Sequence, residues 1–108
     1  NRDELKKVMS YRSYPCVSII AQHKNQPDNK QDPITVKNLV KEAVSRLNQE
    51  FPHREIEPII QRIESIVSSI DYTRTADSIA IYACKDFSAS YDLPVSSKEQ
   101  VIIDETFS

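Results

Sequence analysis

Two apolar repeats with the period of an α-helix lie next to each other at the centre of this chain, and they constrain its fold more than any other feature. The first follows Asp32-Pro33, an acceptor side chain and then a proline, which is typical of the start of a helix. Asn48, Gln49 and Pro52 mark its end, because the residue before a proline is disfavoured in a helix. Its apolar positions fit the i, i+3, i+4, i+7 spacing without a gap: Val36, Leu39, Val40, Ala43, Val44, Leu47 and Phe51.

The second repeat starts after a short connection and is built mainly on isoleucine. Pro58 restricts its start, since proline is tolerated in the first helical turn, so we expect this helix to begin near Arg54 or Glu55. Isoleucine is a mediocre helix former, which means that tertiary burial must hold the helix. The short connection favours an antiparallel pair of helices. The members of the repeat are Ile56, Ile59, Ile60, Ile63, Ile66, Val67 and Ile70.

Strand patterns flank the helical pair on both sides. Residues 16–21 are apolar and β-branched, as in a buried strand, and residues 78–84 form the clearest strand of the chain. Residues 87–93 alternate apolar and polar side chains after a two-residue turn at Lys85-Asp86, and residues 100–104 form a last strand. The β-α-α-β-β-β order predicts an α+β fold, in which a small, mostly antiparallel sheet carries an antiparallel helix pair on one face.

The chain divides into a lead-in and one domain. Residues 1–14 are polar and charged, with Leu5, Val8 and Met9 spaced as in one helical turn. Residues 15–108 are expected to form a single domain. Because the sequence starts at an asparagine and stops soon after a strand pattern, we expect this domain to be the amino-terminal part of a longer multidomain chain.

The sequence of 108 residues contains no glycine, which excludes several classes of site. Phosphate-binding loops, nucleophile elbows and dinucleotide fingerprints all need glycine where the backbone meets the ligand. The chain has 14 Lys and Arg against 16 Asp and Glu, a net charge of −2. That balance argues against a strong nucleic-acid binder, which needs clustered cations. Neither a secretory signal nor an apolar run long enough to span a membrane is visible.

The cysteines and histidines give no clear chemistry. Cys16 and Cys84 are too few for the disulfide framework of a secreted domain, so we expect a reduced, cytoplasmic protein in which both are small buried hydrophobes. A redox or metal role is the alternative if their strands pair. His23, in a polar loop, and His53, between the helices, lack partners at metal-ligand spacing. The carboxylates share helices with arginines, which favours surface ion pairs. The sequence therefore predicts no catalytic residue, no metal site and no cofactor.

Four lysines give a weak indication of a binding surface. Lys24 and Lys30 lie in the polar loop of residues 23–31, and Lys37 and Lys41 share the exposed face of the first helix. Because free N–H groups point outward at the start of a helix, a transition from loop to helix suits contact with phosphate. The alternative is an ordinary solvated helix face.

Six short motifs follow one another from about residue 10 to the end of the chain. They are Tyr14-Pro15-Cys16-Val17-Ser18-Ile19-Ile20, Asp32-Pro33-Ile34, Lys37-Asn38-Leu39-Val40-Lys41-Glu42-Ala43, Ser78-Ile79-Ala80-Ile81-Tyr82-Ala83, Tyr91-Asp92-Leu93-Pro94-Val95 and Val101-Ile102-Ile103. In order and spacing they resemble the amino-terminal domain of the bacterial archaeo-eukaryotic release factor families. The pattern of those families tends to have glycine where Ser78 stands.

The resemblance implies a relative of the class I peptide-chain release factors of archaea and eukaryotes, which have three domains and act at the ribosome. Their amino-terminal domain reads the stop codon, and their middle domain carries a Gly-Gly-Gln motif that triggers hydrolysis of peptidyl-tRNA. This glycine-free chain lacks that motif. It also lacks the codon-reading Asn-Ile-Lys-Ser motif, whose nearest counterpart is Pro33-Ile34-Thr35-Val36-Lys37.

Two functions follow as hypotheses. The first is a non-catalytic domain of a release-factor-like bacterial protein that associates with the ribosome or RNA, in which Lys37 and Lys41 contact phosphates and Asn38 contacts the partner or braces the helix. The second is a protein-interaction or structural module that positions downstream domains of the same chain. Neither involves a membrane, and the oligomeric state stays open. A deep pocket with convergent polar groups would instead favour an enzyme.

Overall fold

Two helices and four strands make up the described part of the chain, in the order that the sequence predicts. The computed structural model describes residues 15–22, 31–73 and 77–104. The predicted lead-in, residues 1–14, and most of the polar loop lie outside the described residues. In chain order the elements are β1 (Cys16–Gln22), α2 (Gln31–Glu50), α3 (His53–Ser68), β2 (Ser78–Ala83), β3 (Ser88–Leu93) and β4 (Gln100–Asp104).

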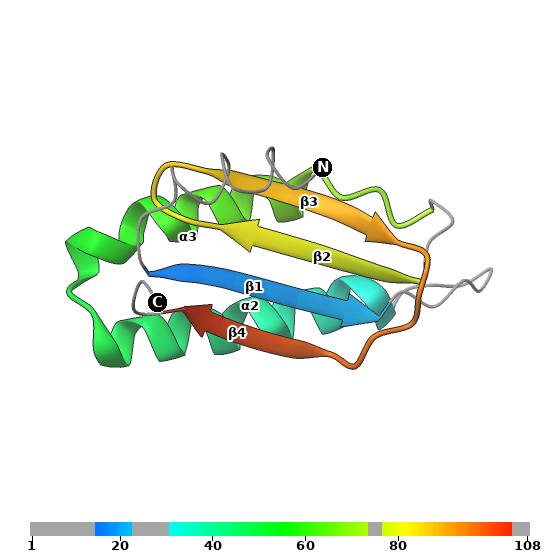
Figure 1. Cartoon of the computed structure of the whole chain (residues 1–108), viewed down its shortest axis with the longest axis horizontal. Helices are drawn as coiled ribbons and strands as arrows, with labels where there is room; N and C mark the ends of the chain where they lie inside the picture. The colour runs from blue at the N-terminus through cyan, green and yellow to red at the C-terminus, as the bar shows by residue number, and fades with distance from the viewer. Residues whose placement is uncertain (1–14, 23–30, 74–76, 105–108) are drawn as a thin grey trace, which may run out of the picture.

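The strands form one antiparallel sheet in the order β3-β2-β1-β4 (Figure 1). Val17 of the inner strand β1 pairs with Ala83 of β2 on one side and with Ile103 of β4 on the other. β3 and β4 lie at opposite edges although they are consecutive in the chain, so residues 94–99 cross the end of the sheet.

The crossing connection is held by a buried serine. Ser78, at the start of β2, has no exposed surface. Its hydroxyl donates a hydrogen bond to the carbonyl of Val95 at 2.7 Å and accepts one from the N–H of Ser97 at 2.9 Å. A glycine at this position would make neither hydrogen bond, so the serine anchors the connection between β3 and β4.

Both helices pack on the same face of the sheet and cover different halves of it. α2 lies behind β1 and β4, and α3 lies behind β2 and β3, running in the opposite direction after the connection at residues 51–52 (Figure 1). Arg46 of α2 donates to the carbonyl of Val101 at 2.9 Å, and Arg62 of α3 donates to the carbonyl of Lys85 at 2.9 Å. Each helix is thereby hydrogen-bonded to the half of the sheet that it covers. The predicted α+β fold is confirmed.

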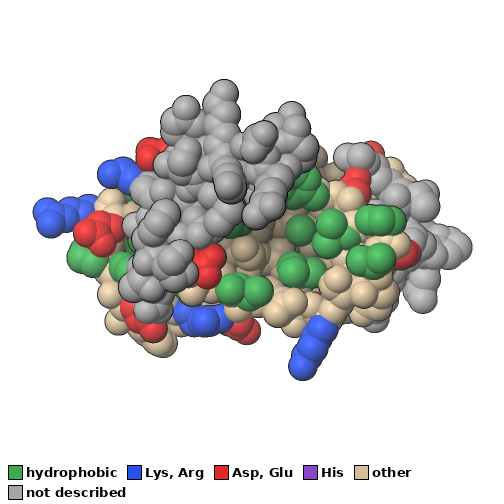
Figure 2. All heavy atoms as spheres, viewed as in Figure 1, with side chains coloured by type: hydrophobic (Ala, Val, Ile, Leu, Met, Phe, Trp, Pro, Cys, Tyr) green, Lys and Arg blue, Asp and Glu red, His purple; other side chains and the backbone are tan. Residues whose placement is uncertain are grey.

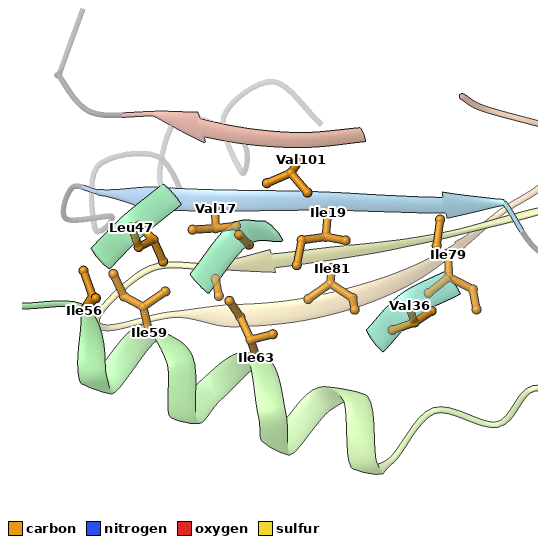
Figure 3. Packing of buried hydrophobic residues seen from close by; sticks show 13 residues of the cluster. Val17, Ile19, Val36, Leu47, Ile56, Ile59, Ile63, Ile79, Ile81 and Val101 are labelled. Atoms are coloured by element: carbon orange, nitrogen blue, oxygen red, sulfur yellow. The ribbon is translucent and has the colours of Figure 1, made fainter. Parts of the chain in front are cut away.

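The core lies between the helix pair and the sheet. The fully buried Ile56, Ile59 and Ile63 point from α3 toward strand residues such as Ile19 and Ile81 (Figure 3). Full burial of such a side chain contributes about 1.5–3 kcal/mol. That exceeds the helix-propensity cost of isoleucine, which is at most about 0.7 kcal/mol. Burial therefore holds α3 in the helical state, as its composition requires.

The boundaries of α2 match the prediction to within a few residues. The sequence predicts that Asp32 caps the helix from the position before its first residue. The helix instead begins at Gln31, so Asp32 lies in its first turn. It ends at Glu50, and the N–H of Phe51 still donates to the carbonyl of Leu47 at 2.9 Å. The chain leaves the helix directly before Pro52, as the steric restriction on that residue requires.

The start of α3 agrees with the prediction to within one residue. The helix begins at His53, next to the predicted Arg54 or Glu55, after an extended Pro52 with φ −60° and ψ 143°. Pro58 therefore lies inside the helix. It lacks the N–H that would donate to the carbonyl four residues earlier. The buried isoleucines on both sides of this missing bond keep the helix continuous.

The hairpin between β2 and β3 confirms the predicted two-residue turn at Lys85-Asp86. The N–H of Cys84 donates to the carbonyl of Phe87 at 2.7 Å, which closes the turn. The paired strands stop one residue short of this hydrogen bond on each side, at Ala83 and Ser88.

The two cysteines are joined in a disulfide, which corrects their interpretation as free, reduced thiols. Because Val17 pairs with Ala83, Cys16 lies directly opposite Cys84, with their Cα atoms 4.5 Å apart. That separation is typical of a non-hydrogen-bonded antiparallel pair and lies within the range that a disulfide spans. Both residues are completely buried. The pairing of β1 with β2 thus brings Cys16 and Cys84 together, which is the condition for the alternative interpretation of the cysteines as a redox pair.

Candidate functional site

A cleft of about 470 Å³ lies between the first half of α2 and the last turns of α3. The antiparallel arrangement brings these two segments side by side, on the part of the helix pair that does not face the sheet core. The cleft lies within the volume range of small-molecule sites. It is lined by Pro33, Lys37, Val40, Lys41, Glu64, Val67, Ser68 and Tyr72.

Three short side chains lie among the lining residues of the two helices. Val40 of α2 and Val67 of α3 are half-buried and pack at the margin of the core, and Ser68 ends α3. Valine and serine do not reach far across the space between two helices, so a gap remains there. The surface that lines the cleft is mainly apolar.

Tyr72 lies in the segment that follows the end of α3 at Ser68, and it lines the same cleft. Oδ1 of Asp71 accepts hydrogen bonds from the N–H of Thr73 at 2.9 Å and from its hydroxyl at 2.5 Å, which fixes the backbone around Tyr72. Burial raises the pKa of the Tyr72 phenol above its usual 10.0, and the negative charge of Asp32 raises it further. The phenol therefore stays uncharged at neutral pH.

Three charged side chains border the cleft. Lys37 and Lys41 lie one turn apart on α2, and Glu64 lies on α3. Within the described part of the chain, neither lysine takes part in an ion pair or side-chain hydrogen bond. The α2 wall thus presents two positive charges beside an apolar surface.

The structure brings together two of the five residues that the sequence singles out for binding. Lys37 and Lys41 both line the cleft, whereas Asn38 is exposed, does not line the cleft and lies inside α2, where it caps neither helix end. Lys24 and Lys30 lie outside the described residues. Lys37 and Lys41 thus lie together at the cleft, and the placement of Lys24 and Lys30 beside them stays a prediction.

Sequence reasoning assigned the apolar residues of the cleft to the core and did not identify Tyr72. Val40 and Val67 belong to the apolar stripes of their helices, so the sequence pattern alone does not distinguish them from the fully buried residues of the same stripes. Their partial exposure at the cleft follows from the packing of the two helices.

The remaining polar groups form no comparable site in the described ranges. His53 starts α3 and lies 3.7 Å from Glu57 one turn later, with both side chains exposed. No group of three or more His, Cys, Asp or Glu residues able to hold a metal ion occurs among the described residues. Neither described helix is long and apolar enough to cross a membrane.

The second face of the sheet is also partly apolar. Since Val17 and Ile19 face the helices, strand alternation turns Ile20, Tyr91 and Ile102 to the other side. Figure 2 shows hydrophobic side chains gathered on this face, and no described helix packs on it (Figure 1). Tyr91 is 54% exposed and Ile102 42% exposed.

No protein-family model and no curated protein sequence matches this chain.

Proposed function

We propose that this domain is a non-catalytic binding module, and that the cleft between α2 and α3 receives a ligand with an apolar body and a negatively charged group. One observation carries the proposal: an apolar cleft of ligand size is bordered on one wall by Lys37 and Lys41, two lysines without an ion-pair partner among the described residues.

The two parts of the cleft have distinct tasks in this proposal. The apolar walls, including Val40 and Val67, provide affinity by removing ligand surface from water. Lys37 and Lys41 select for negative charge and orient the ligand toward α2. The uncharged phenol of Tyr72 adds no repulsion toward an anion.

The probe 1-anilinonaphthalene-8-sulfonate tests this proposal, because it combines an apolar ring system with one negative charge. Backbone amide shifts, followed by NMR during a titration, report where it binds. We expect the shifts to concentrate at residues 37–41 and 64–72. Shifts confined to the second face of the sheet, around Tyr91 and Ile102, would refute the assignment of the site to the cleft.

Matched variants distinguish binding of the probe in the cleft from nonspecific hydrophobic binding. Ser68→Phe places a ring at the end of the cleft from an exposed position and should weaken binding of the probe. Lys98→Gln removes an exposed lysine outside the cleft and should leave binding unchanged. Both variants should keep the circular dichroism spectrum of the parent.

A release-factor-like function is the second candidate, and the exposure of Lys37, Asn38 and Lys41 on one segment of α2 favours it. In this case the domain associates with the ribosome or RNA through that segment. Co-sedimentation of the full-length protein with ribosomes at low salt, where phosphate contacts are strongest, tests it. Absence from every ribosomal fraction would refute this function and leave the cleft proposal intact.

A further inference from the structure

We propose that the cleft between α2 and α3 binds a single-chain amphiphile, with one alkyl chain along the helices and one anionic head at Lys37 and Lys41. This inference rests on the proposed function and specifies its ligand. A fatty carboxylate of medium chain length is the simplest molecule of this class.

The shape of the cleft favours an alkyl chain. On α2 the lining residues run from Pro33 to Lys41, a distance of about 12 Å at the helical rise per residue. An extended chain of roughly nine or ten carbon atoms has this length. The lining between the charged positions is apolar, with Val40 and Val67 on opposite walls.

The charges determine the number and position of the head groups. Lys37 and Lys41 lie on the α2 wall, so an anionic head placed there faces two cations within one helical turn. Glu64 borders the opposite wall and repels a second anion. A molecule with one charged end therefore fits better than one with a negative charge at each end.

The surface around the cleft favours a free molecule over a membrane. The exposed carboxylate of Glu64 borders the cleft, and that of Glu42 directly follows Lys41 on α2; the chain is also negatively charged overall. These carboxylates repel an extended anionic bilayer, whereas a single amphiphile can place its one anionic head at the two lysines of the α2 wall, opposite Glu64.

Calorimetric titrations with three ligands of equal chain length test the inference: decanoate, decanol and decyltrimethylammonium, all below their aggregation concentrations. We expect decanoate to bind about three- to tenfold more tightly than decanol, from the interaction of two exposed lysines with one anion. The cation should bind more weakly than decanol. Among hexanoate, octanoate and decanoate, each added methylene that enters the cleft should strengthen binding by up to about fourfold.

The double variant Lys37→Gln/Lys41→Gln should abolish the preference for decanoate over decanol, and Lys98→Gln should keep it. Equal binding of decanoate and decanol to the parent protein would overturn the inference, as would affinity independent of chain length. Binding to vesicles containing phosphatidylglycerol that decanoate does not displace would also overturn it. If the sulfonate probe occupies the cleft but decanoate does not bind, this inference fails and the proposed function stands. If neither binds, both fail.

Discussion

Removal of the disulfide should destabilise this domain strongly. The bond joins Cys16, the first residue of β1, to Cys84, the residue after β2, and closes a loop with a sequence separation of 68. Between the two cysteines lie β1, both helices and β2. The crosslink therefore restricts most of the described chain in the unfolded state, while in the folded state it connects strands that are already paired.

The magnitude follows from the loop length. Closing a loop of 68 residues lowers the entropy of the unfolded chain enough to stabilise the native state by about 4 kcal/mol at 25 °C. Total stabilities of domains are usually about 5–15 kcal/mol, so the bond supplies a large fraction. For a domain of this size, the midpoint of thermal unfolding should fall by about 16–30 °C when the crosslink is lost.

Urea denaturation of three samples checks this prediction: the oxidised protein, the protein reduced with a phosphine, and Cys16→Ala/Cys84→Ala. The reduced protein keeps both buried sulfur atoms, so its comparison with the oxidised form isolates the crosslink from packing. The denaturant slope m should also increase on reduction, because an unfolded chain without a crosslink exposes more surface. A difference below about 1 kcal/mol between oxidised and reduced protein, where the loop model requires about 4 kcal/mol, would refute the argument.

Three further predictions concern packing, hydrogen bonding and pH. Ile63→Ala should lower the free energy of unfolding by about 2–5 kcal/mol, because Ile63 is fully buried. Glu64→Ala, on the exposed side of the same helix, should change it by less than about 0.5 kcal/mol. Equal effects of the two variants in urea denaturation would contradict the assigned core. Ser78→Ala should lower the free energy of unfolding by about 1–3 kcal/mol, because it removes two hydrogen bonds to the β3–β4 connection. Hydrogen exchange should then show faster opening of residues 94–99. Ser90→Ala, at an exposed position, is the neutral control. The raised pKa of Tyr72 means that the folded protein holds the phenol proton more tightly than the unfolded chain does. The contribution of Tyr72 to the free energy of unfolding should therefore be constant below about pH 10 and fall as the pH rises further. Tyr72→Phe should remove that part of the alkaline decline, and an unchanged pH profile would show that the phenol does not contribute.

Local patterns determine much of the fold. The apolar spacing of α2 and α3 and the β-branched composition of β1 and β2 each correspond to the observed element. Pro58 lies beyond the first turn of α3 although the local rule disfavours proline there, because that rule considers one missing hydrogen bond alone. The burial of Ile56 and Ile59 on either side of it, which outweighs that loss, depends on the sheet beneath and is not visible locally.

The alternation in β3 shows a further limit of local patterns. Period-2 spacing separates Ala89, Tyr91 and Leu93 from Ser88 and Ser90, but it does not indicate which set faces the helices. The register with β2 places Ser90 opposite Ile81, a core residue, and Tyr91 opposite Ala80. The apolar side of β3 therefore faces away from the helix pair. That outcome depends on the pairing of strands, which no single strand encodes.

The candidate cleft follows from the same helical patterns that build the core. In each helix the residues at the centre of the apolar stripe, such as Val36 and Ile63, are fully buried against the sheet. Val40 and Val67 of the same stripes are half-buried and also line the cleft. An apolar stripe wide enough to hold a helix on the sheet thus leaves a second, partly covered strip where the two helices meet. Binding at this strip requires no polar group to be buried without a partner, so a cleft of this kind adds a site to the fold at little cost in stability.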